Sequence, residues 1–341
     1  MSRMLRTLIF TGALFAAQLL PSAVQATPSY SNLFVFGDSL ADSGNNAIVF
    51  DALSGVPSAL RTPTPIVDPV LIPTYPYASN RYSNGPVWAE QMATQLGLSA
   101  LPSLAGGTNY AFGGARVGPS GSSFPYSLRD QVSSYLGASG GVASASALYV
   151  VEGGGNDARD VLNAAFGGGD YATLIGNYAF NVATIITQLK LAGAHDILLW
   201  NVPDIGKIPA IQAFGPVAAA QASLLVGAMN SALDSVLASL PASWMSGLHL
   251  FDAFASFNDL YANPLTYGFD DVHNACAASA ACISDPTGTL FWDGIHPTTA
   301  GHTVLAMAAL AELPEPATFL LFAFALAGLA FSRRRNLHAG F

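Results

Sequence analysis

Positive charge is scarce in this chain of 341 residues. The sequence has 12 lysines and arginines against 21 aspartates and glutamates, a formal net charge of −9, and only 10% of its residues are charged. Nucleic acids and anionic membrane surfaces attract basic patches, whereas an acidic chain repels both. The composition therefore predicts a protein with no nucleic-acid partner, and it suits an exported soluble protein.

The apolar runs at the two ends of the sequence lack the length to cross a membrane comfortably, since a spanning helix needs about twenty apolar residues. The apolar stretch 7–20 follows Arg3 and Arg6 and leads into small residues, a pattern typical of a secretory signal peptide. We expect cleavage after Ala26, so that residues 1–26 form the signal peptide. An N-terminal membrane anchor is the alternative.

The C-terminal apolar run is equally short. It spans the fifteen residues 317–331, follows Pro-Glu-Pro at 314–316 and precedes the arginines 333–335, which would stay on the cytoplasmic side. Segment 314–341 resembles the PEP-CTERM sorting signal of certain Gram-negative bacteria. The resemblance implies export, transient contact with the inner membrane, processing by an exosortase, and a final location at the cell surface, in the matrix or in the medium. A buried helix is disfavoured, because the arginines have no acidic partners nearby in sequence.

Cysteine is nearly absent, which excludes a disulfide-rich scaffold. The two cysteines, Cys276 and Cys282, enclose only Ala-Ala-Ser-Ala-Ala. Nothing nearby supplies the four ligands that zinc prefers, so in an oxidising compartment this pair is predicted to form a disulfide. Two unpaired small residues are the alternative.

Between the two terminal segments, residues 27–313 contain neither an internal repeat nor an obvious linker, and their length suits one large core. Short apolar runs closed by Gly, Pro, Asn or Asp alternate with helix-like runs, which predicts a three-layer α/β domain around a parallel sheet. The expected strands are 33–36, 109–112, 148–152, 197–201 and 248–251. The expected helices are 87–96, 128–136, 171–192, 216–240 and 298–310.

Prolines interrupt this alternation over residues 51–85 and forbid regular helix or inner strand there. We expect an irregular excursion over the surface. Its Tyr75, Tyr77, Arg81 and Tyr82 either overhang the active site or belong to a plain capping loop.

A candidate nucleophile follows the first expected strand. The run Leu33–Phe36 ends in Gly-Asp-Ser, so Ser39 lies just past the carboxyl end of a strand, where open parallel sheets place their chemistry. Serines are also common in ordinary turns. Asp293 and His296, near the C-terminal end of the domain, make Ser39 a stronger candidate. A serine nucleophile needs a base and an acid that orients the base. The alternative role of Asp293 is to cap the helix expected from residue 298.

Four separated blocks resemble the SGNH (GDSL) hydrolases in the order typical of that family. They are Gly-Asp-Ser-Leu at 37–40, Gly-Thr-Asn-Tyr-Ala-Phe-Gly-Gly-Ala at 107–115, Gly-Gly-Asn-Asp at 154–157 and Asp-Gly-Ile-His-Pro at 293–297. The resemblance implies a flavodoxin-like fold with a five-stranded parallel sheet. It also implies a Ser39–His296–Asp293 triad and no cofactor or metal.

The same resemblance implies an oxyanion hole formed by the backbone N–H groups of Ser39 and Gly114 and the side-chain amide of Asn156. A glycine lets the backbone approach the oxyanion closely. Glycines 153–155 also suggest a phosphate cradle, but neither common phosphate-loop spacing is present. A calcium loop starting at Asp38 fails as well, because its twelfth residue is not glutamate.

These patterns predict an exported carboxylic ester hydrolase of the lipase/esterase branch, acting on a small-molecule or lipid ester through an acyl-enzyme on Ser39. One alternative is an O-acetyl esterase acting on exopolysaccharide. The other is a non-catalytic matrix or surface protein that retains a hydrolase fold.

Overall fold

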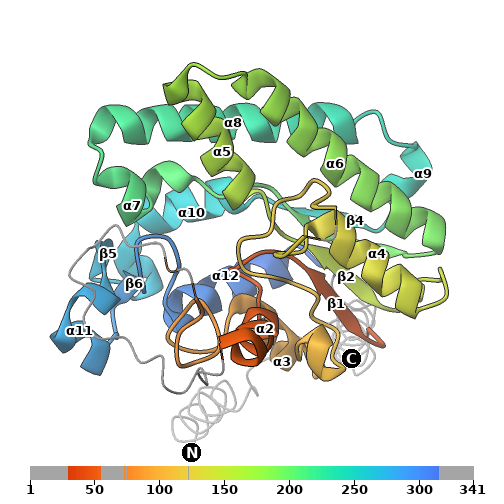
Figure 1. Ribbon diagram of the computed structural model, residues 1–341, viewed down its shortest axis with the longest axis horizontal. Coiled ribbons are helices and arrows are strands. Elements are labelled where there is room, and N and C mark those ends of the chain that lie inside the picture. The colour runs from red at the N-terminus through yellow and green to blue at the C-terminus, as the bar shows by residue number, and fades with distance from the viewer. Residues whose placement is uncertain (1–29, 55–72, 74, 122, 315–341) are drawn as a thin grey trace, which may run out of the picture. The chain divides into compact units, whose positions relative to one another are not determined.

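The computed structural model describes residues 30–54, 73, 75–121 and 123–314. The expected signal peptide 1–26, the sorting tail beyond residue 314 and most of the proline-rich segment 51–85 lie outside the described residues. Residues Tyr30–Leu313 form one compact unit. A parallel sheet lies between two layers of helices in this unit, so the predicted three-layer α/β fold is confirmed (Figure 1).

The central sheet has four parallel strands in the order β1-β2-β3-β4. Side chains alternate between its faces: Tyr149 and Val151 of the second strand enter one apolar cluster, and Leu148 and Val150 enter the other. Because both faces are buried, the strand is apolar at every position. The strands are β1 (Leu33–Phe36), β2 (Leu148–Val151), β3 (Asp196–Trp200) and β4 (Leu248–Phe251).

The fifth expected strand, 109–112, runs parallel to β1 without becoming regular. The Val35 N–H donates to the Thr108 carbonyl at 3.1 Å, and the Tyr110 N–H donates to the Val35 carbonyl at 2.8 Å. The Asn109 side chain accepts the Ala111 N–H at 2.9 Å, which curls the segment. The sheet therefore has four regular strands, with this extended segment at the free edge of β1, as in a flavodoxin-like strand order.

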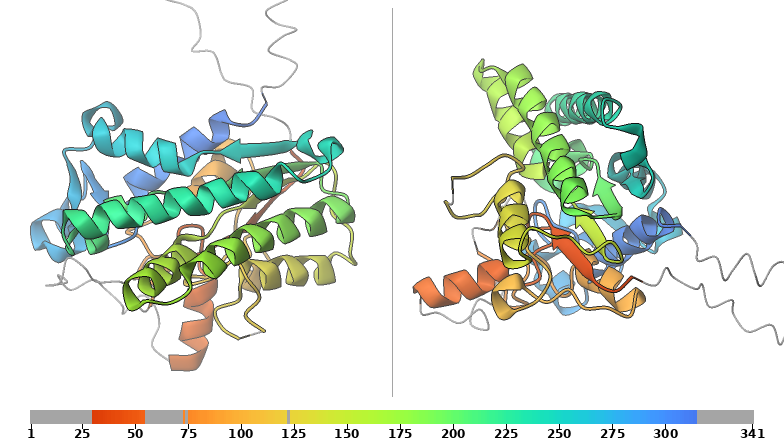
Figure 2. Two further views of the ribbon diagram at one scale, coloured as in Figure 1. Left: turned by 90° about the horizontal axis from the view of Figure 1, so that it is seen from above. Right: turned by 90° about the vertical axis from the view of Figure 1, so that its right-hand side faces the viewer.

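Two helical layers cover the sheet. On one face, α6 and α8 run side by side (Figure 2) and bury Ile185 and Met229. On the other face, α3 and α12 bury Trp88 and Leu305. The helices are α2 (Asn45–Ser54), α3 (Trp88–Gln95), α4 (Leu128–Ala138), α5 (Gly155–Gly167), α6 (Tyr171–Ala192), α7 (Pro209–Gln212), α8 (Pro216–Leu237), α9 (Ala242–Met245), α10 (Ala253–Ala262), α11 (Ala280–Ser284) and α12 (Thr299–Ala311).

A second, two-stranded parallel sheet pairs β5 (Asp271–Ala275) with β6 (Thr289–Phe291). The predicted Cys276–Cys282 disulfide is present between these strands, with the two Cα atoms 5.1 Å apart. The Ala277 N–H beside it donates to the Trp292 carbonyl at 2.8 Å. The disulfide loop therefore braces the segment that leads into Asp293.

Candidate active site

Three chain segments bring polar groups to the carboxyl-terminal edge of the central sheet. Ser39 follows β1, Asn156 lies in the first turn of α5 after β2, and Gly114 follows the edge segment 109–112. All three line one cavity of about 380 Å³. This edge is where doubly wound sheets open a crevice, because the connection after β1 leads to segment 109–112 on one side and the connection after β2 leads to β3 on the other.

Ser39, His296 and Asp293 form a continuous chain of hydrogen bonds. The His296 Nε2 atom lies 2.8 Å from the Ser39 Oγ atom, and the Nδ1 atom lies 2.7 Å from Asp293 Oδ2. His296 and Asp293 are 3% and 1% exposed. Because a carboxylate accepts the Nδ1 proton, the neutral ring presents a lone pair at Nε2 to the serine hydroxyl. This arrangement can remove the hydroxyl proton during attack on a carbonyl carbon.

The Asp293 carboxylate also shapes the loop that carries it. Its Oδ1 atom accepts the backbone N–H groups of Ile295 and His296, each at 2.8 Å. The next helix has its own cap, since the Thr298 hydroxyl accepts the Gly301 N–H at the start of α12. The structure therefore does not support the alternative role of Asp293 as the helix cap.

Tyr77 from the proline-rich segment reaches the same carboxylate. Its hydroxyl donates to Asp293 Oδ2 at 2.9 Å, and its ring packs edge-to-face on Trp292 with ring centroids 5.8 Å apart. Burial, followed by the charge and hydrogen bond of Asp293, raises the pKa of Tyr77. The sequence left open whether Tyr77 overhangs the active site or belongs to a plain capping loop, and the structure places it behind the triad, in contact with Asp293.

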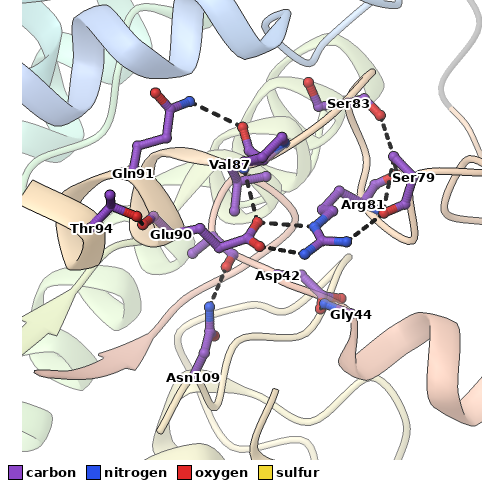
Figure 3. A network of polar contacts seen from close by, with 12 residues as sticks. Asp42, Gly44, Ser79, Arg81, Ser83, Val87, Glu90, Gln91, Thr94 and Asn109 are labelled. Atoms are coloured by element: carbon purple, nitrogen blue, oxygen red, sulfur yellow. Dashed lines mark hydrogen bonds and ion pairs between the residues drawn. The ribbon is translucent and has the colours of Figure 1, made fainter. Parts of the chain in front are cut away.

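The other three candidates in that segment differ in position. Tyr82 lines the cavity, and its ring lies 5.3 Å from the His296 ring, centroid to centroid. Tyr75 is half exposed and packs on Phe50. Arg81 instead forms an ion pair with Glu90 in α3, as Figure 3 shows. Arg81 therefore anchors the segment, and Tyr82 alone of the four lines the cavity.

The expected oxyanion donors are the N–H groups of Ser39 and Gly114 and the Asn156 amide, and they differ in the acceptors that they already contact. The Gly113 N–H donates to Asp42 at 3.0 Å, whereas among the described residues no acceptor is found for the backbone N–H groups of Gly114 and Ser39. Gly114 has a φ of +83°, which favours glycine at this position. The Asn156 amide nitrogen donates to the Ala115 carbonyl at 2.9 Å and to Asp38 Oδ2 at 3.5 Å, the limit of a hydrogen bond.

A buried polar network fixes the first block to the second. The Asn109 amide donates to the Ala41 carbonyl at 2.7 Å (Figure 3), and the Asn45 amide donates to the Asn109 and Ala111 carbonyls. Asp42, which accepts the Gly113 N–H, also accepts the N–H of Asn45. These supporting roles were not predicted from the sequence, although the polar run after Ser39 was a signal for them.

Two buried carboxyl groups lie behind the nucleophile. The Asp38 N–H donates to Glu152 Oε2 at 3.4 Å, and both side chains are 2% exposed. Burial raises the pKa of Asp38 to about 6. Burial and the neighbouring Asp38 raise the pKa of Glu152 well above its ordinary value. Glu152 was visible in the sequence as an acid that closes an apolar strand, but its role was not recognised.

Apolar side chains form much of the remaining wall of the cavity. Phe50 of α2 and Phe124 meet edge-to-face, with ring centroids 5.4 Å apart. Ile205, Phe257 and Leu305 contribute from other elements. In the described part of the chain, no three His, Cys, Asp or Glu side chains gather as metal ligands. The site thus combines a nucleophile-and-base pair with an apolar surface.

Comparison with family models gives two matches. The model described as GDSL-like Lipase/Acylhydrolase matches residues 33–309. The model of the PEP-CTERM protein-sorting motif matches residues 312–335. The first match covers most of the chain, including every residue of the site described above.

The individual relatives and solved structures that resemble this chain share only a modest sequence identity with it. Lipase 1 of Photorhabdus luminescens is 32% identical over 213 residues, which are 62% of this chain but only 28% of that protein. The phosphatidylcholine-sterol acyltransferase of Aeromonas hydrophila is 24% identical and covers 87% of this chain and 94% of its own. Among solved structures, the acetylxylan esterase Axe2 of Geobacillus stearothermophilus aligns over 84% of this chain and 95% of its own, with 15% identity and a TM-score of 0.42.

Replacing Tyr77 with phenylalanine tests the contact behind the triad. Loss of one hydrogen bond to Asp293 should lower kcat by up to about tenfold with little change in KM, because the carboxylate would hold the imidazole less firmly. Ester hydrolysis by Tyr77→Phe is compared with Tyr149→Phe, which removes a buried hydroxyl remote from the site. Equal kcat in Tyr77→Phe and the parent would contradict a positioning role.

Glu152→Gln tests the buried acid pair. A carboxyl group whose folded-state pKa is raised binds its proton more tightly in the folded chain, so its contribution to stability falls as the pH rises above the unfolded value. The isosteric amide cannot ionise. Relative to the parent, Glu152→Gln should therefore gain up to about 1.4 kcal/mol of unfolding free energy per pH unit above roughly 4.5. Denaturant unfolding at pH 4 and pH 7.5 measures this difference, and a constant difference would refute the assignment.

Proposed function

Because this chain belongs to the family of GDSL-like lipases and acylhydrolases and is a carboxylic ester hydrolase, we propose that it cleaves esters through an acyl-enzyme on Ser39. The observation that carries the proposal is the chain of hydrogen bonds from Ser39 through His296 to Asp293. His296 takes the hydroxyl proton while Ser39 Oγ attacks the carbonyl carbon. Asp293 holds the ring and stabilises its positive charge.

The negative oxygen formed by that attack needs donors that are already in place. We assign this role to the backbone N–H groups of Ser39 and Gly114 and to the Asn156 amide; each such donor typically contributes about 10²–10³ in turnover. When the intermediate collapses, His296 gives its proton to the leaving alcohol. Water activated by the same imidazole then attacks the acyl-enzyme, releases the acid and restores the hydroxyl.

The sorting motif indicates export with membrane-associated processing. We further propose that residues 1–26 are removed during export, that the working enzyme is residues 27–313, and that an exosortase-type enzyme processes the tail after transient contact with the inner membrane. The Cys276–Cys282 disulfide is consistent with an oxidising compartment.

Ser39→Ala tests the nucleophile. Removing Oγ should lower hydrolysis of p-nitrophenyl butyrate about 10³-fold or more, because no acyl-enzyme can form. A fluorophosphonate probe should label the parent on Ser39 and leave the variant unlabelled. Ser133→Ala, which alters an exposed serine of α4, is the matched control. Equal hydrolysis by parent and Ser39→Ala would reject the serine mechanism.

Acyl-chain length tests the apolar wall. Each added methylene that the wall buries is worth about 0.8 kcal/mol, so kcat/KM should rise about three- to fourfold per methylene from acetate toward hexanoate. A series of p-nitrophenyl esters measures this slope, with an acetylated polysaccharide assayed beside it. A preference for acetate and for the polymer would favour the exopolysaccharide O-acetyl esterase instead.

A further inference from the structure

Arg159 is exceptional among the cations that the structure describes. Within those residues, its guanidinium forms no ion pair and no hydrogen bond. Each of the others has a polar or aromatic partner. They are Arg81 with Glu90, Arg116 with Asp160, Arg129 with Asn181, Lys190 with the His195 carbonyl and Lys207 over the Tyr261 ring. In a chain so poor in positive charge, an arginine without a partner needs a reason.

The position of Arg159 supplies one. Arg159 lies on α5, three residues after Asn156, so both side chains leave the same face of the helix. Both line the cavity that contains Ser39 and His296. Arg116, which follows the glycine pair at 113–114, lines it too. The unpartnered cation therefore stands beside the oxyanion donors.

The surroundings of Arg159 disfavour its charge. Partial burial, with the neighbouring Arg116 as a second cause, lowers the pKa of Arg159, and the charge of Asp160 offsets this only in part. Arg116 is engaged at Nε and Nη2 by the two Asp160 oxygens. A bound anion would offset the cost of holding a second guanidinium in this place.

The acidic groups of the cavity do not take that role. Asp204 accepts the Ser223 hydroxyl at 2.7 Å and the Gly206 N–H at 2.9 Å. Asp38 accepts the Leu40 N–H at 3.0 Å. Both are 2% exposed and form no ion pair with Arg159. The guanidinium N–H groups of Arg159 are therefore available to a ligand. Their planar arrangement matches the geometry of phosphate oxygens.

Resting on the serine ester hydrolase function above, we propose that Arg159 binds the phosphodiester of a glycerophospholipid whose ester is presented to Ser39. The acyl chain lies along the apolar wall that includes Phe50 and Phe124, and the phosphate lies at the α5 side of the cavity. The cavity then matches both halves of an amphiphilic substrate. A neutral ester would leave the guanidinium unpaired.

Two esters with the same acyl chains test this assignment. Dihexanoylphosphatidylglycerol carries the phosphodiester, and dihexanoylglycerol lacks it. The parent should prefer the phospholipid in kcat/KM, and Arg159→Gln should reduce this preference about tenfold through KM. Arg159→Lys, which keeps the charge without the planar guanidinium, should give an intermediate value. Raising NaCl from 0.05 to 0.5 M should weaken the preference of the parent more than that of Arg159→Gln.

Arg129→Gln is the matched control, because Arg129 donates to Asn181 in a partly buried contact and does not line the cavity. Its substrate preference should equal that of the parent. An equal preference in Arg159→Gln and the parent would overturn the proposal. So would a parent that favours dihexanoylglycerol.

A binding measurement separates this proposal from the catalytic one. Calorimetry on Ser39→Ala should detect dihexanoylphosphatidylglycerol, and adding Arg159→Gln should weaken that affinity about tenfold. This result stands even if the parent hydrolyses no ester, in which case the catalytic proposal alone fails. Inorganic phosphate should bind far more weakly, because it gains no apolar contact. Equal affinity for phosphate and lipid would mark a simple phosphate site and reject the lipid.

Discussion

The hydrogen bond between Ser39 and His296 joins residues 257 positions apart, so two distant loops must be held to within a fraction of an ångström. Buried polar contacts hold each of them. On the serine side, Asp42 and two asparagines fasten the loop after β1 to the segment at its edge. On the histidine side, Asp293 accepts donors from its own backbone and from Tyr77. Such contacts are directional in a low-dielectric interior, where an unmet donor or acceptor is costly.

Those contacts also explain why the sheet has four regular strands. Segment 109–112 runs alongside β1, but the Asn109 side chain bonds to the Ala111 N–H and the Ala41 carbonyl. A regular edge strand would carry its backbone straight on. The curl instead delivers the Gly113 N–H to Asp42 and leaves the next residue, Gly114, in the lining of the cavity, with no acceptor for its N–H among the described residues. The irregular strand is therefore part of how the site is built.

Much of this arrangement was predictable from local sequence. Apolar runs closed by polar residues located the four regular strands to within a residue, because a strand buried on both faces must be apolar throughout. The spacing of Asp293 and His296 suggested that they act together, and the structure places them 2.7 Å apart. Tyr77 and Glu152 were different. Their roles depend on partners far away in sequence, and neither a tyrosine in a proline-rich segment nor an acid after a strand reveals its partner.

One helix links the chemistry to the recognition of substrate. The first turn of α5 carries Asn156 toward the nucleophile, and the next turn carries Arg159 along the same wall. A rigid helix fixes the separation of these side chains, so a phosphate held by Arg159 would set the depth at which an ester carbonyl meets the oxyanion donors. Binding energy from a group that does not react would then position the group that does. Arg159, beside Asn156, has no ion pair among the described residues, and this coupling is the simplest physical account of a free cation at that place on α5.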